Sequence, residues 1–327
     1  MNLFARSPAR THSSENPSNA RSPRRTLRGY GRVSQRIAWV WACCGLLSAC
    51  GVARGVELKV PSNVEFARDI QYANPDNVPL RLNLARPKVA DDRLPAVVCF
   101  HGGGFRQGTR DIYDGLCLEL ATRGYVALTI QYRLSPQSLF PAAVQDCKSA
   151  IRWLRAHAAE YRVDPDRIAV WGGSAGGNLV LMMVATAGVP EFERGDNLGQ
   201  SSAVACGVSF CGASDFTRSY GRSLGAASSL PNYFGGDLSR KRKEHIHGSP
   251  LYWITPQAAP TICIHGTEDP NVACEQSVWM VERLLKAGVK AELFSVQGAG
   301  HGFRGADRVR ADAAGFSFLD RQLKNKQ

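Results

Sequence analysis

Short apolar runs alternate along the chain with longer stretches in which apolar residues recur every three or four positions. The short runs predict buried strands, and the longer stretches predict helices that bury one face. The predicted strands are 65–72, 80–84, 96–100, 126–131, 168–171, 204–210, 261–265 and 291–296. The predicted helices are 113–123, 142–161, 178–187, 275–287 and 309–323.

This alternation fills most of residues 64–325 and predicts one α/β domain. Strands that alternate with helices build a mostly parallel central sheet with helices on both faces. A polar stretch rich in Ser and Gly, residues 214–249, interrupts the alternation. Residues 50–63 have the character of a short linker before the first strand.

Residues 1–49 have a different character and predict a signal segment. They contain eight arginines and a single acid, Glu15, followed by the uncharged run Ile37–Ala49. That run is shorter than the roughly 20 residues that a membrane-spanning helix needs. Its length, and the basic flank before it, are typical of a signal peptide. We therefore expect export to a periplasmic or extracellular space.

The apolar run ends in Leu47-Ser-Ala-Cys50, which resembles the bacterial lipoprotein box. In that reading Cys50 carries the lipid and becomes the mature N-terminus, so the membrane is a partner only through this anchor. The alternative is an ordinary signal peptide with a cysteine near its cleavage site, which gives a freely secreted protein.

Charge and cysteine usage exclude several classes of function. The net charge is +12, but much of it comes from the arginines of residues 1–49. The rest of the chain lacks the dense basic stripe that binding to nucleic acid requires.

The cysteines and histidines argue against common metal and redox sites. No CxxC pair follows Cys50, which removes the common zinc and thioredoxin patterns. His245-Ile-His247 has no nearby acid or cysteine, so a solvated polar segment is favoured over a metal pair. Seven cysteines follow Cys50, an odd number, so at least one of them is unpaired. A disulfide among Cys117, Cys147, Cys211 and Cys274 is compatible with the sequence, which does not determine the pairing.

The strongest chemical signal is Trp171-Gly-Gly-Ser174-Ala-Gly-Gly177, between a predicted strand and an apolar helix. A strand-to-helix turn of the pattern Gly-x-Ser-x-Gly exposes a nucleophilic serine at the helix N-terminus. The alternative, a glycine-rich phosphate loop, is disfavoured because no Lys-Ser or Lys-Thr follows. Ser174 is therefore the candidate nucleophile.

Two further turns supply its partners. His101-Gly-Gly-Gly-Phe105 directly follows the strand 96–100, and its bare N–H groups suit an oxyanion hole. We expect the donors to be Gly103 and Gly104, together with the N–H of Ala175. His301, between glycines, follows the strand 291–296 and is the candidate base.

The candidate acid lies in His265-Gly-Thr-Glu268-Asp269-Pro, after the strand 261–265. The chain order Ser174, Asp269, His301 is that of an α/β-hydrolase triad, in which the acid fixes the tautomer of the histidine. Glu268 stays open as the alternative acid.

These motifs carry a family resemblance that spans most of the domain. The chain resembles α/β-hydrolase fold carboxylesterases of the hormone-sensitive-lipase-like group, and looks closest to their feruloyl-esterase-like branch. It departs from the lipase-like subgroup at Gly173, where Asp or Glu is usual before the serine. The supporting stretches, besides the three turns, are Tyr132-Arg-Leu134, Phe140-Pro-Ala142, Asp146, Trp153-Leu-Arg155 and Val163-Asp-Pro-Asp-Arg-Ile168.

The resemblance implies serine esterase chemistry without a cofactor, Asp269 as the acid before Pro270, and a small cap built from about residues 214–249. We expect short-chain acyl or aromatic esters as substrates, either small molecules or esters linked to polysaccharide. A serine peptidase of the prolyl-oligopeptidase kind is an alternative, although only 100 residues precede His101, too few for its usual propeller. A non-catalytic binding protein of this fold is the other alternative, but such proteins usually lack a triad member. The oligomeric state is not predicted.

Overall fold

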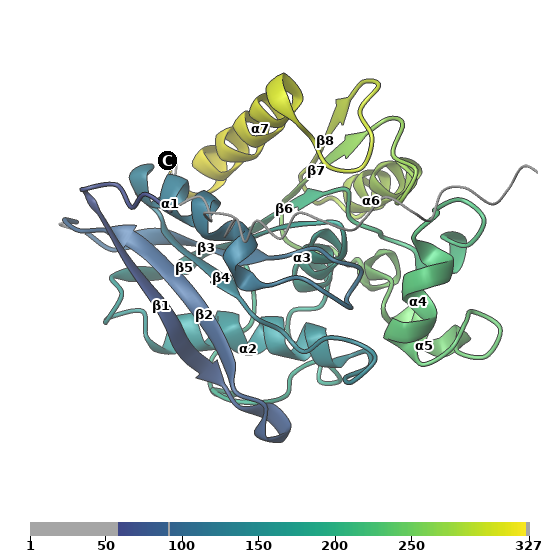
Figure 1. Ribbon diagram of the computed structural model, residues 1–327, viewed down its shortest axis with the longest axis horizontal. Coiled ribbons are helices and arrows are strands. Elements are labelled where there is room, and N and C mark those ends of the chain that lie inside the picture. The colour runs from purple at the N-terminus through teal and green to yellow at the C-terminus, as the bar shows by residue number, and fades with distance from the viewer. Residues whose placement is uncertain (1–57, 91, 325–327) are drawn as a thin grey trace, which may run out of the picture. The chain divides into compact units, whose positions relative to one another are not determined.

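The centre of the molecule is an eight-stranded sheet, in the order β1-β2-β4-β3-β5-β6-β7-β8. A computed structural model describes it within residues 58–90 and 92–324 (Figure 1). Strands β4 to β8 run parallel with β3, while β1 pairs antiparallel with β2 and β2 pairs antiparallel with β4. The strands are β1 (Val64–Ala73), β2 (Leu80–Pro87), β3 (Leu94–Phe100), β4 (Val126–Ile130), β5 (Val163–Gly173), β6 (Cys206–Phe210), β7 (Thr261–Gly266) and β8 (Ala291–Val296).

Helices cover both faces of this sheet. In β3, Val98 packs in one apolar cluster with side chains of α2 and α3, and its neighbour Val97 packs in a second cluster with side chains of α1 and α7. Figure 1 shows α1 and α7 on one side of the sheet and α2 on the other. The helices are α1 (Asp114–Thr122), α2 (Ala142–Ala156), α3 (Ala175–Ala185), α4 (Ala226–Phe234), α5 (Arg242–His247), α6 (Glu275–Lys286) and α7 (Gly305–Leu323). The expected α/β fold, with a mostly parallel sheet, is confirmed.

Several boundaries differ from the sequence prediction for local reasons. Helix α2 ends at Ala156 and not at 161, because the chain turns through Arg162, which has a positive φ of 56°. Strand β5 begins five residues before the predicted 168, since Val163 already pairs with Leu94 of β3. Helix α3 begins at Ala175, directly after the nucleophile turn.

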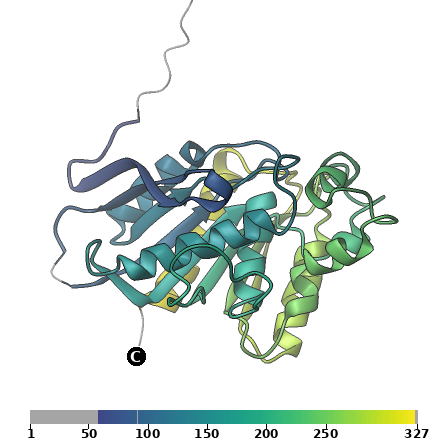
Figure 2. The same cartoon turned by 90° about the horizontal axis from the view of Figure 1, so that it is seen from below.

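Residues 214–249 contain two short helices, α4 and α5, that the sequence pattern did not predict. Figures 1 and 2 show both, in green, at one end of the sheet. Helix α4 packs through Tyr233, whose ring stacks on Phe105 with a centroid distance of 3.8 Å. We refer to residues 214–249 as the cap.

The seven cysteines from Cys99 to Cys274 are all unpaired, so the disulfide that the sequence left open does not form among them. No helix in the described ranges is long and apolar enough to cross a bilayer. The predicted signal segment and Cys50 lie outside the described residues.

Candidate active site

Ser174 occupies a sharp turn between β5 and α3. Its φ of 59° and ψ of −119° lie outside the regions that side chains usually adopt, and such strain is common at functional sites. Two glycines permit the turn. A Cβ on Gly172 would lie 2.4 Å from the carbonyl oxygen of Gly176, and a Cβ on Gly176 would lie 2.0 Å from that of Phe100. The Ser174 N–H donates to Phe210 at 2.8 Å, which ties the turn to β6.

The structure brings Ser174, His301 and Asp269 together from three separate loops. His301 Nε2 lies 2.9 Å from Ser174 Oγ, and His301 Nδ1 lies 2.7 Å from Asp269 Oδ2. Both distances are within hydrogen-bonding range. Glu268, the alternative acid, is exposed, whereas the contact to His301 Nδ1 comes from the buried Asp269. A base between a hydroxyl and a carboxylate is the arrangement that activates a nucleophile.

Asp269 is held from several directions. Its Oδ1 accepts the N–H groups of Asn271 and Val272, at 2.8 and 2.9 Å, and its Oδ2 also lies 3.3 Å from Nε2 of His265. Burial alone would raise the pKa of Asp269, but the hydrogen bonds from His265, His301 and Val272 hold that pKa well below its usual range. The carboxylate therefore remains charged beside the His301 ring.

The loop after β3 faces Ser174. Gly103 and Gly104 adopt positive φ values of 119° and 61°, and the Gly103 carbonyl accepts the N–H of Arg106 at 3.1 Å. Over the described chain, the N–H groups of Gly103, Gly104 and Ala175 donate to no other protein group. All three residues line the same cavity as Ser174. These free donors can receive negative charge on an oxygen.

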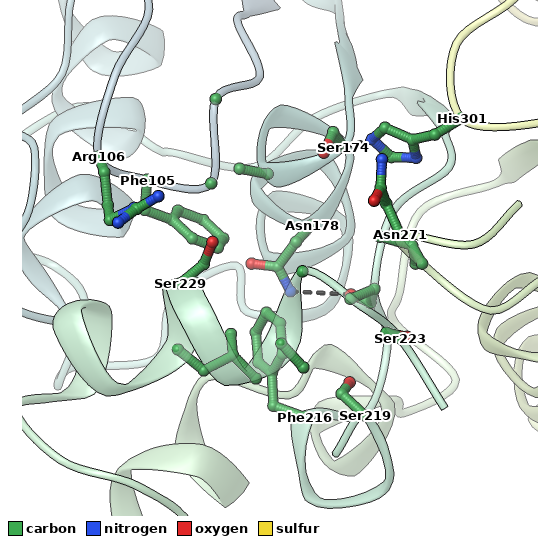
Figure 3. A pocket seen from close by; sticks show the side chains of 18 of the residues that line it. Phe105, Arg106, Ser174, Asn178, Phe216, Ser219, Ser223, Ser229, Asn271 and His301 are labelled. Carbon is green, nitrogen blue, oxygen red and sulfur yellow. Dashed lines mark hydrogen bonds between the residues drawn. The ribbon is translucent and has the colours of Figure 1, made fainter. Parts of the chain in front are cut away.

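This cavity has a volume of about 340 Å³ and lies between the nucleophile and the cap (Figure 3). The cap contributes apolar side chains and several serines to its wall. The residues that line it include Phe105, Asn178, Phe216, Ser219, Ser223, Ser229, Leu230 and His301.

A second, smaller cavity of about 180 Å³ also touches Ser174 and His301. Several aromatic side chains form part of its wall, and Gly173 contributes no side chain to it. A Cβ on Gly173 would lie 3.1 Å from the Tyr113 hydroxyl, so a larger residue would occupy this space. Its aromatic lining residues are Tyr113, Trp171, Phe210 and Phe303.

The root of the cap, by which we mean residues 214–224, is hydrogen-bonded to the loop that carries Asp269 and to the start of α6. The Leu224 N–H donates to the Pro270 carbonyl at 2.8 Å, and the Ala273 N–H donates to Ser223 Oγ at 3.1 Å. Gln276, in the first turn of α6, is buried and accepts the Ser214 N–H at 2.9 Å. Local sequence patterns do not predict these contacts, because they join segments that lie far apart in the chain.

One set of potential metal ligands exists among the described residues: Cys211, His265 and Asp269 lie within 4.8 Å of one another. Their donor atoms already have partners. His265 pairs with Ser277 at 2.7 Å and with the Val272 carbonyl at 2.9 Å. Burial, and then the Asp269 carboxylate, raise the pKa of Cys211 to about 12, so its thiol keeps its proton. This set supports the acid and does not fit a metal.

His245 and His247 do not form a metal pair either. His245 is buried with Nε2 3.0 Å from the Tyr220 hydroxyl, whereas His247 Nδ1 lies 2.8 Å from Glu191. Each imidazole therefore has its own structural partner.

Comparison with known proteins places this geometry in a family. Residues 82–284 match the BD-FAE family. The chain belongs to the BD-FAE family. Solved esterase structures share the fold. One of them is Est2, an esterase of Thermogutta terrifontis, in a structure with bound butyrate. It is 31% identical to this chain, with a TM-score of 0.68, and the match covers 81% of this chain and 97% of Est2. The predicted α/β-hydrolase fold and the resemblance to hormone-sensitive-lipase-like carboxylesterases are thereby confirmed.

Other relatives of this BD-FAE family member extend the comparison. Est2 phosphonylated by sarin aligns at 30% identity with a TM-score of 0.70, over 82% of this chain and 97% of Est2. A truncated carbohydrate esterase from gut microbiota aligns at 25% identity with a TM-score of 0.67, over 80% and 97% of the two chains. Esterase LipC of Mycobacterium tuberculosis is 31% identical over 66% of this chain and 55% of LipC. The chain spans about half the length of the curated relatives it matches.

Proposed function

We propose that this chain is a serine carboxylesterase that hydrolyses esters through an acyl-enzyme intermediate. The observation that carries the proposal is the 2.9 Å contact between Ser174 Oγ and His301 Nε2, at the edge of a cavity that also holds three free N–H groups. A nucleophile, its base and an oxyanion site then meet at one substrate carbonyl.

The chemistry follows from the positions of the atoms. Ser174 Oγ attacks the ester carbonyl carbon while His301 Nε2 takes the hydroxyl proton. The carbonyl oxygen becomes an oxyanion and receives the N–H groups of Gly103, Gly104 and Ala175. Asp269 Oδ2, 2.7 Å from Nδ1, stabilises the imidazolium. The imidazolium then donates its proton to the leaving alcohol oxygen, and the Ser174 acyl ester remains.

In the second half of the reaction, water hydrolyses the acyl ester on Ser174. Water attacks the acyl carbonyl carbon and gives its proton to His301 Nε2. The tetrahedral intermediate collapses, the proton returns to Ser174 Oγ, and the carboxylic acid leaves. Apart from the ester and water, both halves use only groups of this chain.

We propose short-chain acyl or aromatic esters as substrates. A cavity of about 340 Å³ limits the size of the group that the cap can enclose. The butyrate bound to Est2 agrees with a short acyl chain, and the carbohydrate esterase relative is consistent with esters on polysaccharide.

A fluorophosphonate that labels active serines tests the proposal directly. We expect the purified chain to hydrolyse p-nitrophenyl butyrate and to incorporate one label, and Ser174→Ala to lose both. Ser228→Ala is the matched control, because Ser228 is an exposed serine of the cap whose hydroxyl bonds to Gly225. A chain that folds but neither labels nor cleaves esters would support the non-catalytic binding protein. Cleavage of peptide anilides in preference to esters would support the peptidase.

We also propose that the protein is exported and anchored through a lipid on Cys50. The uncharged run Ile37–Ala49 after an arginine-rich flank supports this proposal. Two or three acyl chains, at about 0.8 kcal/mol per buried CH₂, would anchor the protein stably. Cys50→Ala is expected to remain an unprocessed precursor or to move from the membrane to the soluble fraction. A mature chain that starts after Cys50 without modification would instead indicate plain secretion.

A further inference from the structure

The side-chain amide of Asn178 has a nitrogen that is hydrogen-bonded and an oxygen that is not. Its Nδ2 donates to the Ala213 carbonyl at 2.9 Å and to the Gly248 carbonyl at 3.4 Å. Because carbonyl oxygens only accept hydrogen bonds, these two contacts identify that end of the amide as the nitrogen. The Asn178 Oδ1 atom is then the only end left, and it has no hydrogen-bond partner within residues 58–90 and 92–324.

This free acceptor is buried. Asn178 is 1% exposed, and an acceptor taken out of water without a partner has a cost in free energy. A protein rarely leaves such an atom unpaired, and a group that donates to it recovers the cost. Asn178 Oδ1 is therefore a place where a ligand donor would bind favourably.

Asn178 lies one helical turn beyond the nucleophile. Its N–H donates to the Ser174 carbonyl at 3.0 Å, which places Asn178 in the first turn of α3, directly after the nucleophile. Figure 3 shows its oxygen turned toward Phe105 and Ser229, away from His301. Asn178 is also part of the wall of the larger cavity.

The neighbouring hydroxyl groups of the cap are mostly committed elsewhere. Ser223 Oγ accepts the Ala273 N–H, and Ser219 Oγ donates to the Asp215 carbonyl at 3.0 Å. Phe216 and Leu230 complete the wall with apolar surface. Gln107, Ser229 and Asn271 also contribute polar side chains to this wall. Asn178 Oδ1 differs from them because it is both buried and without a partner in the described chain, so a ligand donor gains most by binding there.

The cavity with Asn178 suits the acyl half of an ester. It contains the three N–H groups that receive the carbonyl oxygen, so an acyl chain extends from there along the cap. The smaller aromatic cavity lies beside Gly302 and Phe303, next to the imidazole that protonates the leaving oxygen, and it is available to the alcohol half.

We propose that Asn178 Oδ1 is a specificity determinant for acyl groups that carry a hydroxyl on the third carbon of the chain. This inference rests on the proposed esterase function. The hydroxyl donates to Asn178 Oδ1, one helical turn from the ester bond on Ser174. An acyl group of the same length without the hydroxyl leaves the acceptor unpaired and is the poorer substrate.

Matched p-nitrophenyl esters of butyrate, 3-hydroxybutyrate and 3-methoxybutyrate test the proposal, with both enantiomers of the substituted acids. The methoxy ester keeps the oxygen but cannot donate. We expect the wild-type kcat/KM for one 3-hydroxybutyrate enantiomer to exceed those of the other two acids by tenfold or more. In Asn178→Ala we expect this ratio to fall toward one, while Ser228→Ala keeps the wild-type ratio.

Equal kcat/KM values for 3-hydroxybutyrate and butyrate in the active wild type would overturn the proposal, even if Asn178→Ala does not fold. A preference that survives in soluble Asn178→Ala would also overturn it. So would a preference for 2-hydroxyethyl butyrate over ethyl butyrate with none on the acyl side. Failure to label with the fluorophosphonate or to cleave any ester would instead refute the proposed function, and this inference with it.

Discussion

His301 and Asp269 are joined by a single short contact of 2.7 Å, between Nδ1 and Oδ2. The other carboxylate oxygen, Oδ1, is fully used by the N–H groups of Asn271 and Val272. One oxygen therefore holds the loop in shape, and the other orients the imidazole. This division makes the two roles of Asp269 separable by mutation.

Asp269→Asn should keep the loop and lose the chemistry. The amide oxygen can still accept from Asn271 and Val272, which turns the amide NH₂ toward His301 Nδ1. That donor forces the ring proton onto Nε2, where it blocks the acceptance of the Ser174 proton. We expect kcat to fall by about 10³–10⁴ with a retained cooperative melt.

Glu268→Gln is the matched control for that experiment, since Glu268 is the adjacent exposed acid. We expect steady-state kinetics close to wild type. If Glu268→Gln lost activity while Asp269→Asn kept it, the acid would be Glu268.

Glycine at 176 is required by close packing, whereas glycine at 115 is not. A Cβ on Gly176 would lie 2.0 Å from the Phe100 carbonyl oxygen, and one on Gly115, in α1, would meet nothing within 4 Å. We expect Gly176→Ala to lower the free energy of unfolding by more than about 3 kcal/mol, or to prevent folding. Gly115→Ala should raise it by about 0.5–1 kcal/mol. Urea unfolding of both variants checks the pair, and equal effects would contradict this packing.

Gly173 keeps the smaller cavity open, so a side chain there should change the range of alcohols. Gly173→Asp restores the residue type usual in the lipase-like subgroup and would place its carboxyl against Tyr113. We expect kcat/KM for phenyl butyrate to fall at least fivefold relative to methyl butyrate, since lost pocket space discriminates by roughly 10–200-fold per methylene. An unchanged ratio in the active variant would remove this cavity from substrate binding.

Stability should decline in mild acid because two histidines are buried. Burial lowers the pKa of His101 and that of His245, so folding favours their neutral forms. Their contribution is fully present above the unfolded value of about 6.5 and is lost as the pH falls through the lower folded values. We expect the free energy of unfolding, measured in urea between pH 7.5 and 5.0, to decrease below about pH 6.5.

His101→Gln should flatten that dependence. His101 stacks on Tyr132 at 4.3 Å, and glutamine cannot take up the proton that destabilises the folded state. An identical pH slope in wild type and variant would show that other groups cause the acid sensitivity. At lower pH, the depressed pKa of Asp269 adds a further loss of the same sign.

Local patterns were sufficient to predict most of the fold. The parallel strands β3 and β5 contain the apolar runs 96–100 and 168–171, and the three turns that follow β3, β5 and β7 are marked by glycines and polar residues. The carboxyl ends of parallel strands meet at one edge of a sheet, so residues 127 positions apart, Ser174 and His301, could be expected to meet. Their roles in catalysis remain predictions.

Features that depend on tertiary packing could not be predicted in this way. Helix α4 contains Pro231 and little local helical signal, and it is held by the stacking of Tyr233 on Phe105. Asn178 has the appearance of a helix cap at the start of an apolar stretch, yet α3 begins three residues earlier at Ala175. Its position four residues after Ser174 was the available signal, because the first turn of α3 directly follows the nucleophile.

The bonds between Leu224 and Pro270, and between Ser223 and Ala273, have a consequence for how such an enzyme diversifies. These bonds attach the cap, which forms part of the substrate cavity, to the loop that carries Asp269. Insertions at the root of the cap would disturb hydrolysis of every ester alike, whereas replacements on the inner face of α4 would alter preference alone. Libraries aimed at new substrates should therefore vary α4 and leave residues 214–224 as they are.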